Sequence, residues 1–276
     1  MPVMLKKELV MMRIPYIPNG DFKKYIKESG ITEILSCYRH LLLSIEHLIN
    51  INIVHYDLKE DNILFNRRLN NPIIIDFGLS FQRTDVPPSN LKELKKYFYV
   101  YEPTYSLWPL DVHLLCLIAD DYSNPVTNDK IEEMCKRYVY KAFYDPAQQA
   151  QAEQQALADP SLIYGPMTPI QKFFYDKSIA YYGGFVNIPL NEVVNSLLKN
   201  WKTWDLYAIH LMFYKRTSER SSERSSERSS ERSNGEPVDI FTTYIDELMM
   251  NQLDPDPTKR KNVSELMDKI QEIYYL

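Results

Sequence analysis

The chain has 276 residues, of which 45% are hydrophobic, 25% charged and 13% aromatic, as expected for a globular protein with an aromatic-rich interior. Its 32 Lys and Arg against 37 Asp and Glu give a net charge of −5, which argues against nucleic acid as the main partner. Three separated cysteines argue against a disulfide framework or a zinc site. The sequence shows neither a membrane span nor a signal-peptide pattern, so we expect an intracellular, cytoplasmic protein without a membrane partner.

The N-terminal part of the chain combines a short apolar run with an irregular segment. Residues 9–12 predict a strand, and residues 14–21 contain two prolines and an Asn-Gly pair that interrupt regular structure. From the local sequence alone, Asp21 is a helix N-cap. Residues 32–50 carry apolar side chains at intervals of three and four, which predicts a buried amphipathic helix.

The most informative stretch follows this helix. Apolar runs at 53–54, 63–65 and 73–75 predict short strands joined by tight turns. Four polar residues lie between or just after them: Asp57, Lys59, Asn62 and Asp76. Phosphoryl transfer needs a base that orients a hydroxyl, a cation near the moving phosphoryl group and oxygen ligands for Mg²⁺, and these residue types supply all three.

The spacing of these four residues, together with the Asp-Phe-Gly element that ends at Gly78, resembles the catalytic loop and metal-binding turn of the eukaryotic protein kinase family. Lysine two positions after Asp57 resembles the serine/threonine type. The layout is also similar to kinase-like proteins of large DNA viruses, which would place the protein in a host cell. The resemblance implies a mainly α (α+β) fold: a kinase C-terminal lobe with a hinge strand, small catalytic-loop β-hairpins and a helical insertion, and with the N-lobe largely absent.

Carried over residue by residue, the resemblance makes Asp57 the catalytic base and Lys59 the cation that holds the γ-phosphate. Mg²⁺ would be bound by Asn62 and Asp76. ATP would be held at four further positions: the carbonyl of Pro15, the amide of Ile17, the carboxylate of Asp21 and the side chain of Leu64. For any one of these residues, a solvated carboxylate or a turn residue is the simpler interpretation. The four fixed offsets together favour the kinase interpretation.

Several supporting residues follow from the same resemblance. Asp205 resembles the aspartate of the central helix that binds the catalytic-loop backbone. Tyr56 replaces the arginine that usually receives a phosphate on the activation loop, so we expect an activity independent of such phosphorylation. Arg260 resembles an arginine that is paired with a buried glutamate, but that glutamate is absent at its own position. Glu102 is the expected substitute.

The expected organisation has six parts. These are 1–22, a remnant of the last small-lobe strand and hinge; 23–110, the large lobe with catalytic loop and activation segment; 111–200, a helical insertion; 201–216, the central helix; 217–236, a disordered Ser-Glu-Arg repeat; and 237–276, the C-terminal helices. The repeat has no apolar face to offset the entropy of ordering, although a helix with Glu and Arg stripes is the alternative. Asn262 and Glu265 predict a capping box at the last helix.

The elements that clamp a nucleotide from the small-lobe side are missing from this sequence. Its 7 glycines form no Gly-x-Gly-x-x-Gly pattern, and the sequence begins near the expected hinge. Three interpretations remain open. The chain is part of a serine/threonine kinase that transfers the ATP γ-phosphate to a protein hydroxyl, it is an inactive pseudokinase that serves as a protein-binding module, or a partner chain supplies or replaces the N-lobe. The protein substrate is not specified by any pattern.

Overall fold

The computed structural model describes residue 16 and residues 20–143, 165–228 and 247–274. Its helices and strands are α1 (Phe22–Glu28), α2 (Ile31–Asn50), β1 (Ile53–Val54), η1 (Glu60–Asn62), β2 (Ile63–Asn66), β3 (Asn71–Ile74), β4 (Phe81–Gln82), η2 (Arg83–Asp85), α3 (Leu91–Leu94), α4 (Leu110–Asp120), α5 (Asn128–Ala142), α7 (Pro169–Tyr182), η3 (Gly183–Phe185), α8 (Leu190–Leu198), η4 (Trp201–Thr203), α9 (Trp204–Arg228), η5 (Pro257–Lys259) and α11 (Val263–Tyr274). Residues 247–252 are also helical. The predicted mainly helical fold with small strands is confirmed over these residues.

Helix α2 is the amphipathic helix that the sequence predicts. Its apolar stripe is buried, with Leu35, Leu41 and Ile45 each 0% exposed. The helix begins where the Glu33 carboxylate accepts a hydrogen bond from the backbone N–H of Gly30 at 2.7 Å, which satisfies one of the donors that a helix start leaves open. Strand β3 and helices α9 and α11 pack against α2. Helix α2 therefore supports the part of the fold that carries the catalytic loop.

The strands form two small antiparallel pairs, β1 with β4 and β2 with β3. In the second pair Ile63 lies opposite Ile74, as expected for the predicted hairpin, although β3 begins at Asn71 rather than at residue 73. Asp21 adds an isolated bridge to Leu64 on the free edge of β2. These short pairings bring the segment before the catalytic loop, the loop itself and the Asp-Phe-Gly element together.

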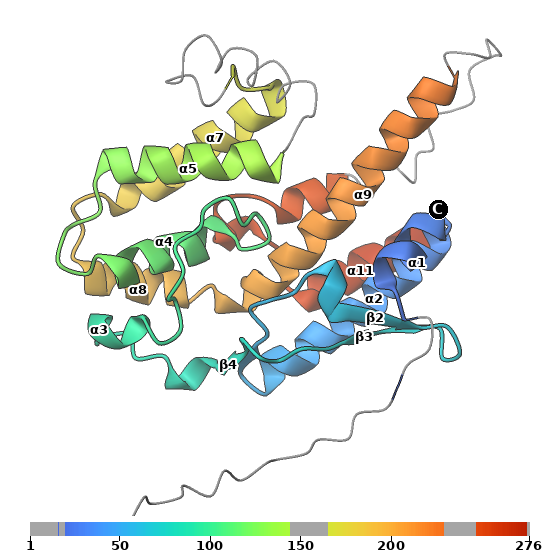
Figure 1. The fold of residues 1–276 in the computed structure, drawn as a ribbon, viewed down its shortest axis with the longest axis horizontal. Coiled ribbons are helices and arrows are strands. Elements are labelled where there is room, and N and C mark those ends of the chain that lie inside the picture. The colour runs from blue at the N-terminus through green and yellow to red at the C-terminus, as the bar shows by residue number, and fades with distance from the viewer. Residues whose placement is uncertain (1–15, 17–19, 144–164, 229–246, 275–276) are drawn as a thin grey trace, which may run out of the picture.

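Helix α9 is the central element of the fold. Its residues 204–213 are all buried, because apolar side chains surround this part of the helix on every side. One core cluster packs around Trp204, Tyr207 and Leu211, and a second packs around Ile209 and Phe213. Figure 1 shows α9 running between these two groups of elements and projecting beyond them at its far end. Neither α9 nor any other helix in the described ranges has the length and apolarity needed to cross a membrane.

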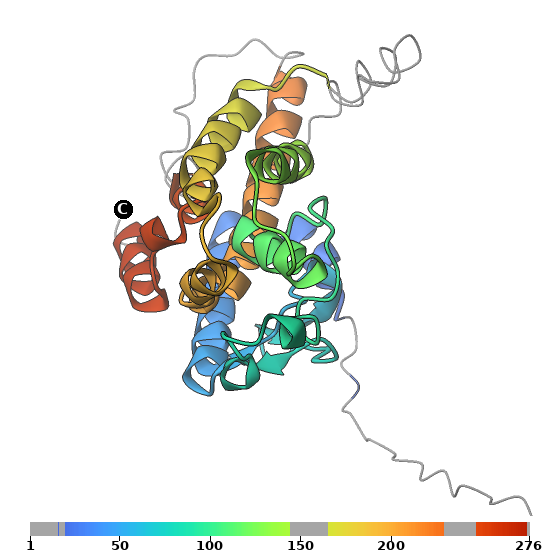
Figure 2. The same cartoon turned by 90° about the vertical axis from the view of Figure 1, so that its left-hand side faces the viewer.

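The helices of residues 111–200 belong to the same core as the catalytic loop. Helices α4, α5, α7 and α8 contribute to one cluster that also contains Tyr56, which agrees with the helical segment predicted over 111–200. Figure 2 shows these four helices in front of α9. The Gln/Ala-rich piece 147–156 lies outside the described residues. The segment expected as an insertion therefore completes the hydrophobic core around the catalytic loop.

The Ser-Glu-Arg repeat differs from the expectation of disorder over 217–236. Helix α9 continues through the repeat to Arg228, and residues 229–236 lie outside the described residues. The buried residues 204–213 account for the helix, because they provide the nucleus, which is the costly step in helix formation. The charge pattern is neutral on balance: Arg and Glu recur three positions apart, which favours a helix, but like charges recur four positions apart, which opposes it.

The C-terminal helix and its cap agree with the prediction. Helix α11 begins at Val263, and Asn262 and Glu265 form the capping box: Asn262 N–H donates to Glu265 Oε2 at 2.8 Å and Glu265 N–H donates to Asn262 Oδ1 at 3.0 Å. Within the predicted C-terminal helices of 237–276, a helix is also present at 247–252, and residues 237–246 lie outside the described ranges. Helix α11 packs against α2 (Figure 1), and Leu248 and Met249 belong to the same core cluster.

Arg260 forms a buried ion pair, but with a different partner from the one expected. Its guanidinium donates to Asp111 Oδ2 at 3.2 Å and lies 4.8 Å from the ring centre of Tyr207. Burial is the largest influence and works against the guanidinium charge, but Asp111 and the neighbouring tyrosine hydroxyls together outweigh it and raise the pKa of Arg260. The expectation for Glu102 is wrong, because Glu102 pairs with Arg137 of α5 at 3.2 Å. Asp111, fully buried at the start of α4, takes the role instead.

Candidate active site

The catalytic loop gathers three polar side chains around the carboxylate of Asp57. Lys59 Nζ lies 2.7 Å from Asp57 Oδ2, and Asn62 Nδ2 donates to the same oxygen at 2.8 Å and to the Asp57 carbonyl at 2.8 Å. The hydroxyl of Tyr105 donates to the other carboxylate oxygen, Oδ1, at 3.0 Å. The structure thus brings together the predicted base, the predicted phosphate-binding cation and one predicted metal ligand.

A buried carboxylate of α9 fixes the backbone of this loop. Asp205 accepts hydrogen bonds from the backbone N–H groups of His55 at 2.8 Å and Tyr56 at 3.0 Å, as the sequence predicts. Burial raises the pKa of the Asp205 carboxyl, and the two N–H donors oppose that rise. Tyr56 has a φ of 70°, a left-handed conformation that costs energy in a non-glycine residue and persists only where the surroundings hold it. Asp205 therefore holds a strained loop in place.

The side chain of Tyr56 explains how the fold tolerates an aromatic residue beside Asp57. Its ring packs against Trp108 and Phe98 in the larger core cluster, and its hydroxyl lies 3.6 Å from Cys116 Sγ. Burial is the first cause that raises the pKa of Tyr56. A residue in this place contributes packing and carries no charge for a phosphorylated loop. The expectation of phosphorylation-independent activity stays a prediction.

The Asp-Phe-Gly element lies beside the loop through backbone contacts. The N–H of Ile75 donates to the carbonyl of Asn62 at 2.9 Å, which places Asp76 one residue beyond that contact. His55 donates from Nε2 to the carbonyl of Ile75 at 3.0 Å, and its ring lies 4.8 Å from that of Phe77. His55 thus braces the turn. Asp76 is exposed and adopts a φ of 62°.

The donor set fits Mg²⁺. The two hydrogen bonds of the Asn62 side chain to Asp57 come from Nδ2, so its amide oxygen is the atom that suits a cation. Asp76 supplies a carboxylate, and its Oδ1 also accepts the Gly78 N–H at 3.2 Å. An amide oxygen and an exposed carboxylate are ligands that Mg²⁺ uses with nucleotide phosphates. Within the described residues no three His, Cys, Asp or Glu side chains cluster as a metal site on their own.

The residues predicted to hold the nucleotide base are only partly described. Pro15 and Ile17 lie outside the described residues, so their roles stay predictions. Leu64 is partly buried on β2 and faces Asp21 through the isolated bridge. Asp21 is the N-cap of α1, with its carboxylate accepting the Lys24 N–H at 2.9 Å. The helix-cap interpretation of Asp21 is therefore confirmed, and a ribose contact stays a prediction.

Tyr105 is the site residue that sequence reasoning did not find. It lies 48 positions after Asp57, in a segment where the sequence departs from the kinase pattern, so no spacing marks it. Burial and the neighbouring Asp57 carboxylate both raise the pKa of its hydroxyl, which therefore remains a hydrogen-bond donor. The backbone carbonyl of Tyr105 contacts His113 Nε2 at 3.1 Å, which ties the residue to α4.

This arrangement resembles the catalytic loop of protein kinases, and the comparisons with known proteins show the same likeness. Residues 2–103 match the family model of the protein kinase domain. All eight predicted site residues lie within that stretch. The match covers less than half of the chain, and the helices from α4 onward lie beyond it.

Three curated relatives show the same likeness. The chain is 34% identical over 74 residues to a cell division control protein 7 homologue of Encephalitozoon cuniculi, a stretch that is 27% of this chain and 21% of that protein. It is 33% identical over 72 residues to a non-specific serine/threonine protein kinase of Drosophila melanogaster (26% and 11%). It is 30% identical over 105 residues to the cell cycle protein kinase spo4 of Schizosaccharomyces pombe (35% and 24%). The matched part of the chain thus spans less than a quarter of each relative.

Proposed function

We propose that this protein carries out serine/threonine protein kinase chemistry, with ATP as the phosphoryl donor and Mg²⁺ as the cofactor. The observation that carries the proposal is the carboxylate of Asp57, held at 2.7–2.8 Å by Lys59 and Asn62 on a loop that Asp205 supports. Phosphoryl transfer asks mainly for positioning and charge stabilisation, and this loop supplies a fixed base beside a fixed cation. The resemblance to kinase-like proteins of large DNA viruses stays a prediction.

In the proposed reaction the oxygen of a substrate serine or threonine bonds to the γ-phosphorus of ATP. The bond from that phosphorus to the oxygen it shares with the β-phosphate breaks, ADP leaves, and the hydroxyl proton passes to Asp57. Lys59 stabilises the charge that develops on the γ-phosphoryl oxygens. Bound Mg²⁺ would neutralise charge on the phosphates, and Asn62 and Asp76 are the residues that would hold it.

Clamping of ATP from the small-lobe side calls for a glycine-rich loop and a lysine-bearing strand. The sequence has no Gly-x-Gly-x-x-Gly pattern, and the described residues include no such strand. We propose that a partner chain, or a further segment of the same protein, supplies them. The proposal assigns the base, the phosphate-binding cation and the metal ligands to this chain. Nucleotide binding is therefore the first property to test.

The test is a thermal-shift measurement with Mg·ATP. Saturation at 100 times Kd stabilises a protein by about 2.7 kcal/mol, which for a chain of this size raises Tm by roughly 5 °C. Asp76→Ala should abolish the shift, whereas Asp57→Asn should keep it and lower the phosphotransfer rate by about 10²–10⁴-fold. The matched control is Asp120→Asn, an exposed α4 residue paired with Lys95. No shift, or an equal shift with Asp76→Ala, would sink nucleotide binding at this site by this chain on its own.

A catalytically inactive binding module is the second candidate, and one observation favours it. Both oxygens of Asp57 are engaged within the chain, Oδ2 by Lys59 and Asn62 and Oδ1 by the hydroxyl of Tyr105. An acceptor hydroxyl must displace that last contact before Asp57 can take its proton. Tyr105→Phe separates the two candidates, because it frees Oδ1 and should preserve or raise the transfer rate of a kinase. If neither the parent protein nor the Tyr105→Phe variant transfers phosphate, with or without an added kinase small lobe, the result supports the binding module.

A further inference from the structure

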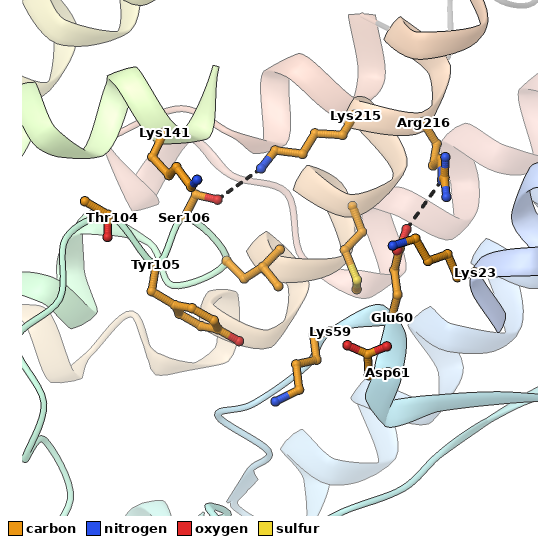
Figure 3. A pocket seen from close by; sticks show the side chains of 12 residues that line it. Lys23, Lys59, Glu60, Asp61, Thr104, Tyr105, Ser106, Lys141, Lys215 and Arg216 are labelled. Atoms are coloured by element: carbon orange, nitrogen blue, oxygen red, sulfur yellow. Dashed lines mark hydrogen bonds and ion pairs between the residues drawn. The ribbon is translucent and has the colours of Figure 1, made fainter. Parts of the chain in front are cut away.

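The hydroxyl of Tyr105 lies where the acceptor of a phosphoryl group is needed. It donates to Asp57 Oδ1 at 3.0 Å, within the distance of about 2.6–3.2 Å at which a general base takes a proton. Lys59, the expected phosphate-binding cation, contacts the other oxygen of the same carboxylate at 2.7 Å. Figure 3 shows the Tyr105 side chain with its hydroxyl directed toward Lys59. The chain therefore places one of its own hydroxyl groups beside both the base and the cation.

A cavity adjoins this hydroxyl. It has a volume of about 430 Å³ beside the catalytic loop, and Tyr105 and Lys59 both line it (Figure 3). This volume lies within the range of about 300–1,000 Å³ that is usual for ligand pockets. Tyr105 is only partly buried. Its hydroxyl thus contacts the base and remains accessible to the phosphoryl group of a nucleotide.

Two other hydroxyl groups line the same cavity, those of Thr104 and Ser106, and both are engaged elsewhere. Thr104 Oγ1 donates to Glu102 Oε1 at 2.5 Å. Ser106 is buried, and its Oγ accepts a hydrogen bond from a lysine of α9 at 3.0 Å. Among the three hydroxyl groups that line the cavity in the described part of the chain, that of Tyr105 contacts Asp57. The geometry selects the tyrosine although a threonine and a serine are its neighbours.

The backbone of Tyr105 is held on both sides. Its N–H donates to the carbonyl of Glu102 at 2.9 Å. Its carbonyl accepts hydrogen bonds from the Trp108 N–H at 3.3 Å and from His113 Nε2 at 3.1 Å. The ring lies edge-on to that of Trp108, with the ring centres 5.0 Å apart. Because the hydroxyl is positioned in advance, transfer to it avoids the entropy loss of bringing a separate acceptor to the base.

We propose that Tyr105 is a modification site and that this chain transfers the γ-phosphoryl group of ATP to it within the same molecule. The inference rests on the proposed function and names an internal substrate. In this step the phenol oxygen bonds to the γ-phosphorus. The bond from that phosphorus to the oxygen it shares with the β-phosphate breaks, and ADP leaves with the bonding electrons. The phenol proton passes to Asp57 Oδ1, and the product is a chain with one phosphotyrosine.

The test is incubation of the full chain with Mg·ATP, alone and with a saturating kinase small lobe, followed by mass spectrometry of the protein and its peptides. We expect one phosphate per chain, on Tyr105. The rate constant should stay the same when the protein is diluted, because acceptor and base share one molecule. Burial and Asp57 raise the pKa of the Tyr105 hydroxyl, so the phenol keeps its proton until a base removes it. Asp57→Asn should therefore lower the rate by about 10²–10⁴-fold, and Tyr105→Phe should abolish the modification.

The matched control is Tyr99→Phe, which changes an exposed tyrosine earlier in the same segment. It should leave the modification of Tyr105 unchanged, and circular dichroism should show that all variants are folded. Phosphate on Tyr99 or on a serine of the Ser-Glu-Arg repeat in place of Tyr105 overturns the proposal. A rate constant that rises with protein concentration also overturns it, because transfer would then occur between molecules.

A thermal-shift measurement with Mg·ATP on the same samples separates this inference from the proposed function. A shift without phosphate on Tyr105 overturns the inference and leaves nucleotide binding in place. Transfer to an added serine peptide, with Tyr105 unmodified, overturns the inference and supports the proposed function. Absence of both the shift and any transfer, with and without the small lobe, refutes the two together.

Discussion

Replacing Asp205 by asparagine should destabilise the protein far more than the loss of one charge on the surface. The carboxylate accepts two backbone N–H groups, from His55 and Tyr56, at 2.8 and 3.0 Å. Asparagine keeps one acceptor oxygen but turns an NH₂ donor toward the second N–H. One charge-assisted hydrogen bond is lost, at about 1.5–3 kcal/mol, and one buried N–H is left without an acceptor, at about 1–3 kcal/mol.

The sum is a loss of about 2.5–6 kcal/mol in the free energy of unfolding, a large part of the roughly 5–15 kcal/mol that domains possess. Urea unfolding followed by tryptophan fluorescence measures it, since the chain has 3 tryptophans. The control is Asp176→Asn, whose exposed pair with Lys172 on α7 should contribute at most about 0.5 kcal/mol. A loss below about 1 kcal/mol for Asp205→Asn would show that the catalytic loop does not depend on α9 in this way.

The remaining predictions concern pH and the buried ion pair. Burial lowers the pKa of His113 to about 4 and that of His210 to about 3, against 6.5 for an ordinary histidine. The unfolded chain therefore binds more protons between these values, so stability is lost as the pH falls below 6.5. The free energy of unfolding should drop by about 2 kcal/mol per histidine from pH 7 to pH 5, and a flat profile in urea titrations at several pH values would contradict this. Arg260→Met should cost about 3–5 kcal/mol because it leaves Asp111 buried and charged, whereas the double variant with Asp111→Leu should recover most of the loss. A double-mutant cycle measures this, and additive losses would refute the pairing.

The parts of the fold that sequence predicts well are those fixed by local patterns. The stripe of α2, the pairing of β2 with β3 and the capping box at Asn262 each follow from residues a few positions apart. The offsets of Asp57, Lys59 and Asn62 also predict their meeting, because a loop of six residues cannot separate them widely. Asp205 was found only through the family resemblance, since it lies about 150 residues away.

The parts that sequence did not predict depend on distant partners or on competing effects. Arg260 and Asp111 lie 149 positions apart, and no periodicity relates them. Tyr105 lies where the pattern departs from the kinase family, so nothing in its surroundings connects it to Asp57. For the Ser-Glu-Arg repeat, composition alone favours disorder, but the preceding ten buried residues of α9 supply a helical nucleus that composition does not reveal.

Because α9 continues into the Ser-Glu-Arg repeat, the number of repeat units in the helix determines its length. The helix has 25 residues, which makes it about 37 Å long. Each Ser-Ser-Glu-Arg unit adds about 6 Å and rotates the end of the helix by about 40°. The buried first part and the catalytic loop that it holds are unaffected by such a change. Gain or loss of one unit would thus alter how far, and in which direction, the helix reaches from an unchanged candidate active site.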